Sequence, residues 1–176
     1  YQMYRQGNTL YSGGSSNNST WQFGIGGAAE KSKAYVSELV IYDRPLTAGE
    51  LQKAHSYLGI KYGFHTPISY IASDSTVVWD ATANANYHND VAGIGRDDAS
   101  VLNQKQSKSG TGTSGLAIGV GSIAANNAAN GNTISADKSF LLWGHNNGSL
   151  TKAVSAASDV DTILQRVWRV KETGTI

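Results

Sequence analysis

The chain of 176 residues contains no cysteine, which excludes disulfide bonds, thiolate metal sites and a cysteine nucleophile. Charged residues make up 15 %, against roughly 25 % in an average soluble domain, and no basic cluster is present. Surfaces for nucleic acid or anionic membranes need such a cluster, so we expect no nucleic-acid partner. No apolar run approaches the roughly 20 residues of a membrane-spanning helix, so we expect no membrane insertion.

The composition favours β-structure. The chain has 20 glycines but only two prolines, and Asn, Ser, Thr and Ala fill many other positions. Gly and Asn tolerate positive φ angles, and Ser and Thr bond to nearby backbone, so this mixture is typical of short strands joined by turns. We therefore predict a mainly β protein built as an antiparallel β-sandwich.

Several segments have the apolar or alternating pattern of a strand. The segment 34–42 is apolar almost throughout, as expected of a strand in the middle of a sandwich. Residues 1–11 and 21–25 are further candidates near the N-terminus. The later candidates are 76–79, 90–95, 115–120, 139–143 and 166–170.

One helix is predicted near residues 47–61. Thr47 and Glu50 have the spacing of a capping box, in which each side chain binds the other residue's backbone N–H. Apolar residues follow on one helical face, and a C-terminal stop follows them: Leu51, Ala54, Leu58 and Gly63. We expect this apolar stripe to cover a β-sandwich.

The composition shifts toward Asn, Ala, Ser and Gly after Pro67. We therefore predict two domains, residues 1–65 and residues 66–176, the second of them a β-sandwich of immunoglobulin-like size. The sequence starts at Tyr1 and its last residues have the pattern of a strand entry. We interpret it as part of a larger protein, with the second domain truncated at its C-terminal end.

No catalytic motif stands out. The four histidines are scattered, and no pair has a zinc-binding spacing with a nearby Glu. We interpret His55 as a structural histidine beside the helix stripe, whereas His88 either frames a site or belongs to a turn. No nucleophile-elbow motif occurs, and isolated carboxylates neither support nor exclude a glycosidase pair. We predict that the chain is not an enzyme.

An acidic cluster is the one candidate metal site. Asp90, Asp97 and Asp98 offer the hard oxygen ligands that Ca²⁺ accepts, so calcium is a possible cofactor there. The alternative is that Asp97 and Asp98 cap a turn while Asp90 faces water. The segment 93–98 lacks the third glycine of a dinucleotide-binding loop and is interpreted as a strand end that runs into a tight turn.

The tryptophans also leave two alternatives open. An exposed Trp on a sandwich face stacks on sugars, whereas Trp buried between sheets is more common. The four positions are Trp21, Trp79, Trp143 and Trp168.

Residues 34–63 read AYVSELVIYDRPLTAGELQKAHSYLGIKYG. This segment resembles the end of laminin-G-like, concanavalin-A-type jelly rolls, in which a strand leads through Tyr-Asp-Arg into a capped helix. The resemblance covers about residues 20–63. The strands that carry the calcium and sugar sites of that family would lie upstream, so the resemblance implies no site residue here.

The later segments VWD (78–80), NDVAGIGRDD (89–98), LNQKQS (102–107), SFLLWG (139–144) and RVWRVKETG (166–174) also resemble a family. They are similar to an uncharacterised β domain that follows such jelly rolls in large bacterial exported, adhesin-like surface proteins. The resemblance covers most of residues 66–176. It implies an extracellular or cell-surface location and adhesion.

We therefore predict a non-catalytic extracellular binding or adhesion module of a large secreted or surface-anchored bacterial protein. Its partners would be a glycan or a cell-surface protein, together with the rest of the parent polypeptide. Two alternatives remain at this point: a purely structural spacer, and an accessory module of a polysaccharide-degrading enzyme.

Overall fold

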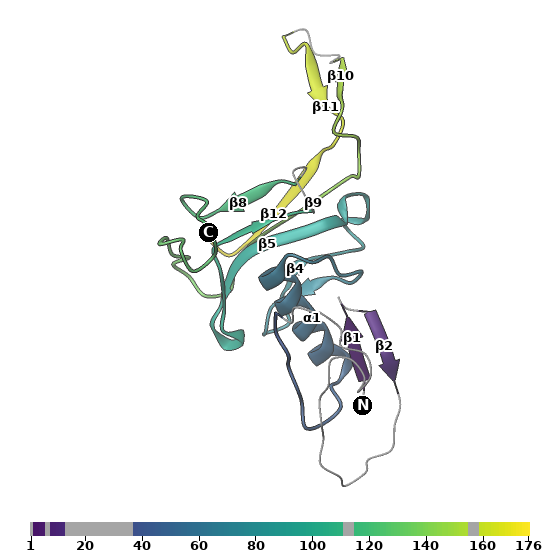
Figure 1. The fold of residues 1–176 in the computed structure, drawn as a ribbon, viewed down its shortest axis with the longest axis vertical. Coiled ribbons are helices and arrows are strands. Elements are labelled where there is room, and N and C mark those ends of the chain that lie inside the picture. Colours follow the sequence, from purple (N-terminus) through teal and green to yellow (C-terminus); the bar gives the residue numbers. More distant parts are fainter. Residues whose placement is uncertain (1, 6–7, 13–36, 111–114, 155–158) are drawn as a thin grey trace, which may run out of the picture. The chain divides into compact units, whose positions relative to one another are not determined.

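The computed structural model describes residues 37–110, 115–154 and 159–176, together with the backbone of residues 2–5 and 8–12. The chain divides into two compact units, Tyr1–Leu46 and Thr47–Ile176 (Figure 1).

The first unit contains one antiparallel pair, β1 (Gln2–Arg5) and β2 (Asn8–Ser12). The strand predicted at 34–42 is not found in its described part, since residues 37–42 belong to none of the described strands. Its apolar residues are 45–75 % exposed: Leu39, Val40, Ile41 and Tyr42. The strand predicted at 21–25 lies outside the described residues.

The second unit begins with the helix α1 (Ala48–Tyr62), which confirms the helix prediction. Glu50 Oε2 accepts a hydrogen bond from Thr47 N at 2.9 Å, and Glu50 N donates to Thr47 Oγ1 at 3.3 Å. These two bonds satisfy backbone N–H groups that the first helical turn leaves without intrahelical partners. Gly63 ends the helix in the left-handed conformation, with φ of 65°.

The face of α1 that is buried is not the one that the sequence predicts. The buried residues are His55, Ser56, Gly59 and Ile60, whereas the predicted stripe of Leu51, Ala54 and Leu58 is only half-buried. Gly59 permits this packing, because a Cβ atom there would lie 2.9 Å from the Tyr70 ring. The Ser56 hydroxyl also accepts a hydrogen bond from Ile71 N at 2.9 Å. Close approach and a buried hydrogen bond, rather than the most apolar stripe, therefore orient α1.

The rest of the second unit is antiparallel β-structure with two short 3₁₀ turns. A four-stranded sheet has the order β12-β9-β5-β6, and the pairs β3-β4, β7-β8 and β10-β11 are separate two-stranded sheets. The bounds are β3 (Tyr70–Ile71), β4 (Val77–Trp79), η1 (Ala85–Tyr87), β5 (Asn89–Asp97), η2 (Asp98–Ser100), β6 (Leu102–Gln104), β7 (Gln106–Lys108), β8 (Ala117–Gly119), β9 (Ser139–His145), β10 (Lys152–Val154), β11 (Thr162–Leu164) and β12 (Trp168–Thr173). The five strands predicted after residue 70 correspond to β4, β5, β8, β9 and β12.

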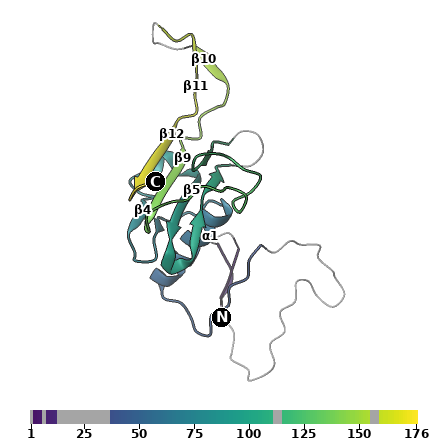
Figure 2. The same ribbon diagram turned by 90° about the vertical axis from the view of Figure 1, so that its left-hand side faces the viewer.

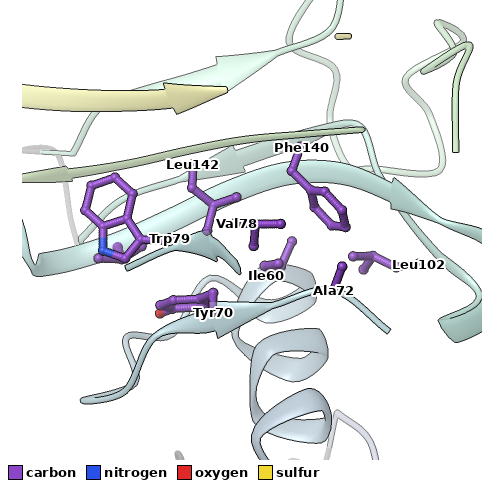
Figure 3. Close-up of a cluster of buried hydrophobic side chains, with 9 residues drawn as sticks. Ile60, Tyr70, Ala72, Val78, Trp79, Leu102, Phe140 and Leu142 are labelled. Atoms are coloured by element: carbon purple, nitrogen blue, oxygen red, sulfur yellow. The ribbon is translucent and has the colours of Figure 1, made fainter. Parts of the chain in front are cut away.

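Both faces of the four-stranded sheet are covered. Figures 1 and 2 show α1 and β4 on one side of β5 and β9. The core on that side consists of Ile60, Tyr70, Ala72, Val78, Trp79, Val91, Leu102, Phe140 and Leu142 (Figure 3). On the opposite face, Ala92, Ile94 and Trp143 pack against side chains that include Leu116, Ile118 and Val120. Alternate residues of β9 therefore contribute side chains to two cores, one on each face of the sheet.

Two glycines of β5 make the first core possible. A Cβ atom at Gly93 would lie 2.7 Å from Leu142 Cγ, and one at Gly95 would lie 3.0 Å from the Ser139 carbonyl oxygen. The absent side chains leave room for Leu142 and Phe140 on the neighbouring strand. The sequence interpretation placed the end of a strand and a tight turn within residues 93–98. In the structure, β5 continues to Asp97 and the turn begins at Asp98.

The mainly β architecture with antiparallel sheets and a single described α-helix confirms the coarse fold class. The second compact unit begins at Thr47 and includes α1, whereas the sequence prediction placed the helix in the first domain and the boundary at 65/66. The physical reason is that Ile60 lies in the same core as Tyr70 and Phe140. Within the described residues, no helix has the length and apolarity needed to cross a membrane.

Candidate functional site

Polar side chains gather near both ends of β5. The histidine cluster consists of His65, Trp79, His88, Asp90 and His145. The carboxylate cluster consists of Ser73, Arg96, Asp97, Asp98 and Lys138. Seven residues of extended chain separate the two clusters, which corresponds to roughly 23 Å along the strand.

In the histidine cluster, the buried indole of Trp79 fixes one imidazole. Trp79 Nε1 donates a hydrogen bond to His88 Nδ1 at 3.0 Å. An imidazole nitrogen that accepts a hydrogen bond carries no proton, so the proton of neutral His88 lies on Nε2. The geometry therefore determines the tautomer of His88.

His65 approaches His88 from the connection between α1 and β3. The two ring centroids are 4.6 Å apart, and the ring planes are inclined at 66°. His65 Nδ1 and His88 Nε2 are both buried. Burial lowers the pKa of both rings, and for His65 the neighbouring His88 lowers the pKa further while Asp90 raises it. The backbone carbonyl groups of Pro67 and Thr66 act in the opposite direction on His88 and raise its pKa, but burial has the larger effect. Both rings are therefore held in their neutral form.

His145 is fixed by bonds to both of its ring nitrogens. Asn147 N donates to His145 Nδ1 at 2.9 Å, so the proton of the neutral ring lies on Nε2, 3.0 Å from Asp90 Oδ2. Asn89 Nδ2 also donates to the His145 carbonyl oxygen at 2.8 Å. A general base needs a ring nitrogen within reach of the proton it removes. Because both nitrogens of His145 are engaged, this pair is a structural contact between β9 and β5.

The carboxylate cluster is made of ion pairs. Buried Asp97 accepts hydrogen bonds from Ser73 N and Ser73 Oγ, both at 2.7 Å, and forms an ion pair with Lys138. Arg96 binds both oxygens of Asp98 at 2.8 Å. These contacts join the β3–β4 turn, β5 and the start of β9.

The same contacts set the charge state of the carboxylates. Burial alone raises the pKa of Asp97, but the hydrogen bonds from Lys138 and Ser73 outweigh burial and lower the pKa overall. The hydrogen bonds from Arg96 lower the pKa of Asp98. The Asp97 hydrogen bond in turn raises the pKa of Lys138. These groups are therefore ionised at neutral pH.

The structure does not bring the three predicted calcium ligands together. Asp97 binds Ser73 and Lys138, Asp98 binds Arg96, and Asp90 binds His145 near the other end of β5. Across the described residues, no group of three His, Asp or Glu side chains is arranged to hold a metal ion. The calcium prediction therefore gains no geometric support.

The partners of these carboxylates could not be found from sequence proximity. Lys138 lies 41 residues beyond Asp97, and His145 lies 55 residues beyond Asp90. The antiparallel pairing of β5 with β9 places Asn89 opposite His145 and Arg96 opposite Ser139, next to Lys138. The sequence signal for these contacts is the alternation of apolar residues in β5 and β9. This alternation predicts the two strands but does not specify the register in which they pair.

The tryptophans that the structure describes are not exposed platforms. Trp79 and Trp143 are fully buried, and Trp168 is half-buried beside His145, with ring centroids 6.2 Å apart. These positions agree with the more common alternative, Trp packed between sheets. Trp21 lies outside the described residues.

Comparison with known proteins gives a family but no named relative. No curated protein and no solved structure matches the chain. One family model matches residues 50–176, so its first residue lies inside α1 and its match falls within the compact unit Thr47–Ile176. The chain belongs to this family, which is described as "Domain of unknown function (DUF8202)".

Proposed function

We propose that the chain is a non-catalytic extracellular binding or adhesion module of a large secreted or surface-anchored bacterial protein. The observation that carries this proposal is an exposed aliphatic region between β10 and β12. Five aliphatic side chains in this region are 46–87 % exposed: Val154, Ile163, Leu164, Val167 and Val170. Exposed apolar groups of this kind mark surfaces that bind other molecules when they form a patch.

The two polar clusters support a non-catalytic role. Both nitrogens of His145 have partners, and Asp97 and Asp98 are paired with cations of the chain. A nucleophile–base pair needs an imidazole or carboxylate that is free to take a proton. His145, Asp97 and Asp98 instead stabilise the fold through these contacts.

The chemistry of the exposed region favours a protein over a glycan as the partner. Aliphatic side chains supply no hydrogen-bonding group for sugar hydroxyls, and Trp168 is the one described tryptophan that is not fully buried. Extended segments with exposed aliphatic residues suit contact with another protein chain. A cell-surface protein or the rest of the parent polypeptide is therefore the proposed partner class.

The finer architecture is part of the same proposal. Residues 1–65 are proposed to be the end of a laminin-G-like jelly roll, and the residues that follow a second β-sandwich of immunoglobulin-like size. The support for the jelly roll is the sequence resemblance of residues 34–63.

A binding assay tests the proposal directly. The intact chain, displayed on beads, is assayed for adhesion to cells and for binding to a glycan array. Adhesion is expected to fall at least about tenfold when Ile163 and Val170 are both replaced by Lys, since such interface positions contribute 1 kcal/mol or more each. Val101→Lys is the matched control, because Val101 is 86 % exposed but lies in the β5–β6 turn.

Three results would contradict parts of the proposal. Glycan binding that survives the double substitution would identify a carbohydrate module instead. Adhesion that is unchanged in the double variant would show that the aliphatic region is not the binding surface. Absence of both adhesion and glycan binding would favour the structural spacer.

A further inference from the structure

The contact among Trp79, His88 and His65 has a consequence beyond binding. Trp79 is fully buried in the first core, and its indole N–H requires an unprotonated Nδ1 on His88. A proton added to neutral His88 must go to Nδ1, because Nε2 already carries one. Protonation of His88 and the Trp79 hydrogen bond therefore exclude each other.

The same tautomer argues against a metal ion between the two histidines. A neutral imidazole binds a metal through a nitrogen that carries no proton. His88 Nδ1 is occupied by Trp79, and Nε2 is protonated, so the buried Nε2 cannot be a ligand while the hydrogen bond exists.

His65 makes a positive charge in this place more unfavourable. With ring centroids 4.6 Å apart, two imidazolium ions would repel each other strongly. The charged or titratable groups around the pair are Asp90 at the start of β5, His145 on β9, which binds Asp90, and Arg169 on β12, which lies over the Tyr87 ring. Asp90 is already engaged by His145, so no carboxylate is held against His88.

We propose that the Trp79–His88 hydrogen bond is an acid-sensitive contact beside the connection 63–69: uptake of a proton by His88 Nδ1 breaks this bond. Burial lowers the pKa of both histidines, so the contact is closed at neutral pH and opens only in acid. The proton comes from solvent, and no covalent bond changes.

The opening is local because other bonds hold the ends of the connection. Tyr70 Oη accepts a hydrogen bond from Thr66 N at 3.1 Å and donates to the Phe64 carbonyl oxygen at 3.4 Å. Gln52 Nε2 donates to the Ser69 carbonyl oxygen at 2.9 Å. None of these groups titrates between pH 4.5 and pH 7.5, so α1 and β3 stay in place when the histidines charge.

The test follows the tryptophan indole N–H signals of the intact chain by NMR between pH 7.5 and pH 4.5. The Trp79 signal is expected to move as the pH falls below the ordinary histidine pKa of about 6.5. The Trp143 signal serves as the internal control, because Trp143 Nε1 donates to the Leu116 carbonyl oxygen at 3.1 Å, which does not titrate in this range.

A substitution isolates His88. In His88→Asn, the side-chain oxygen can take the position of Nδ1 and accept the Trp79 hydrogen bond, but it does not titrate. The pH dependence of the Trp79 signal should disappear in this variant. Any of three outcomes would overturn the proposal. The Trp79 signal would stay constant with pH in the wild type, it would still move with pH in His88→Asn, or it would move together with the Trp143 signal.

If His88→Asn does not fold, the tautomer of His88 in the wild type tests the proposal. Long-range ¹H–¹⁵N spectra of the wild-type histidines at pH 7.5 should show His88 protonated on Nε2 and unprotonated on Nδ1. A proton on Nδ1 at this pH would be incompatible with the Trp79 hydrogen bond and would refute the acid-sensitive contact.

Discussion

The two ends of β5 hold their polar groups in opposite ways. At the start of the strand, His88 accepts a hydrogen bond from the buried Trp79 indole, and burial lowers the pKa of His65 and His88. At its end, ionised carboxylates are paired with Lys138 and Arg96, and these partners lower the pKa of Asp97 and Asp98. Burial at the first end disfavours a positive charge on the two histidines, whereas ion pairs at the second end compensate the charges of the carboxylates. The difference shows that a single strand can join the sheet to its covering layers by two kinds of polar contact with different pH ranges.

Removal of the buried Asp97 carboxylate should destabilise the end of β5, and this is the largest effect that we expect. Asp97→Asn leaves the Ser73 donors and Lys138 without an ionised partner, and we expect the free energy of unfolding to fall by about 3 kcal/mol. Urea denaturation followed by circular dichroism measures this change. Asp98→Asn is the matched control, because Asp98 is 54 % exposed and its loss should cost about 0.5 kcal/mol. Equal losses in both variants would show that burial of Asp97 does not matter.

A side chain added at Gly95 of β5 should destabilise the folded protein. A Cβ atom there would contact the Phe140 ring and lie 3.0 Å from the Ser139 carbonyl oxygen. We expect Gly95→Ala to reduce the free energy of unfolding by about 2 kcal/mol, the range for overpacking a core. Gly131→Ala is the control, since a Cβ atom at Gly131 would meet nothing within 4 Å. A neutral Gly95→Ala would mean that β5 and β9 can separate without cost.

The pH dependence of stability should distinguish the two ends. The folded-state pKa of His65 and His88 lies below the unfolded value, so their contribution is present above about pH 6.5 and is lost as the pH falls through the folded pKa. For Asp97 the lowered pKa gives a contribution that is present above about pH 4 and is lost at more acidic pH.

Thermal melts of the wild type between pH 8 and pH 2.5 should therefore show two acid-induced decreases. Asp97→Asn should keep the first decrease and weaken the second. If the substitution instead removes the decrease near pH 6, the assignment of the two ranges to the two ends of β5 is wrong.

The smallest expected effect is an increase in stability, and it concerns the turn that follows the end of β5. Val101 has φ of 56°, a left-handed conformation that is unfavourable for a β-branched residue, and its side chain is 86 % exposed. Val101→Gly should therefore raise the melting temperature, with a gain of about 1 kcal/mol. Val154→Gly, at a position 87 % exposed in β10, should give no gain and serves as the control. A loss of stability in Val101→Gly would show that the valine side chain has a contact in the folded protein.

Local sequence signals determined the local structure of this protein. The capping box of Thr47 and Glu50 and the stop at Gly63 predicted α1 to within a residue at each end, because caps depend on neighbours in the chain. Apolar runs predicted β5 and β9 for a similar reason, since a buried strand needs apolar side chains whichever partner it has.

Short or polar strands gave no such signal. β6 and β7 have mostly polar sequences, LNQ and QSK, and are strands because they pair with β5 and β8. The segment 37–42 shows the converse, because it has a strong apolar pattern and yet belongs to no strand among the described residues. Pairing partners are distant in the sequence, so a pattern in one segment cannot supply them.

Only the tertiary structure decided which polar groups meet. The sequence placed Asp90, Asp97 and Asp98 close together in one short segment, and from this proximity it predicted a common calcium site. An extended strand instead separates Asp90 from the other two by roughly 23 Å. Lys138 and His145 come from β9 and its preceding turn, through a register fixed by the two cores. The sequence by itself thus determined the helix caps and the central strands, whereas the packing of α1 and the partners of each carboxylate and histidine depend on contacts across the sheet.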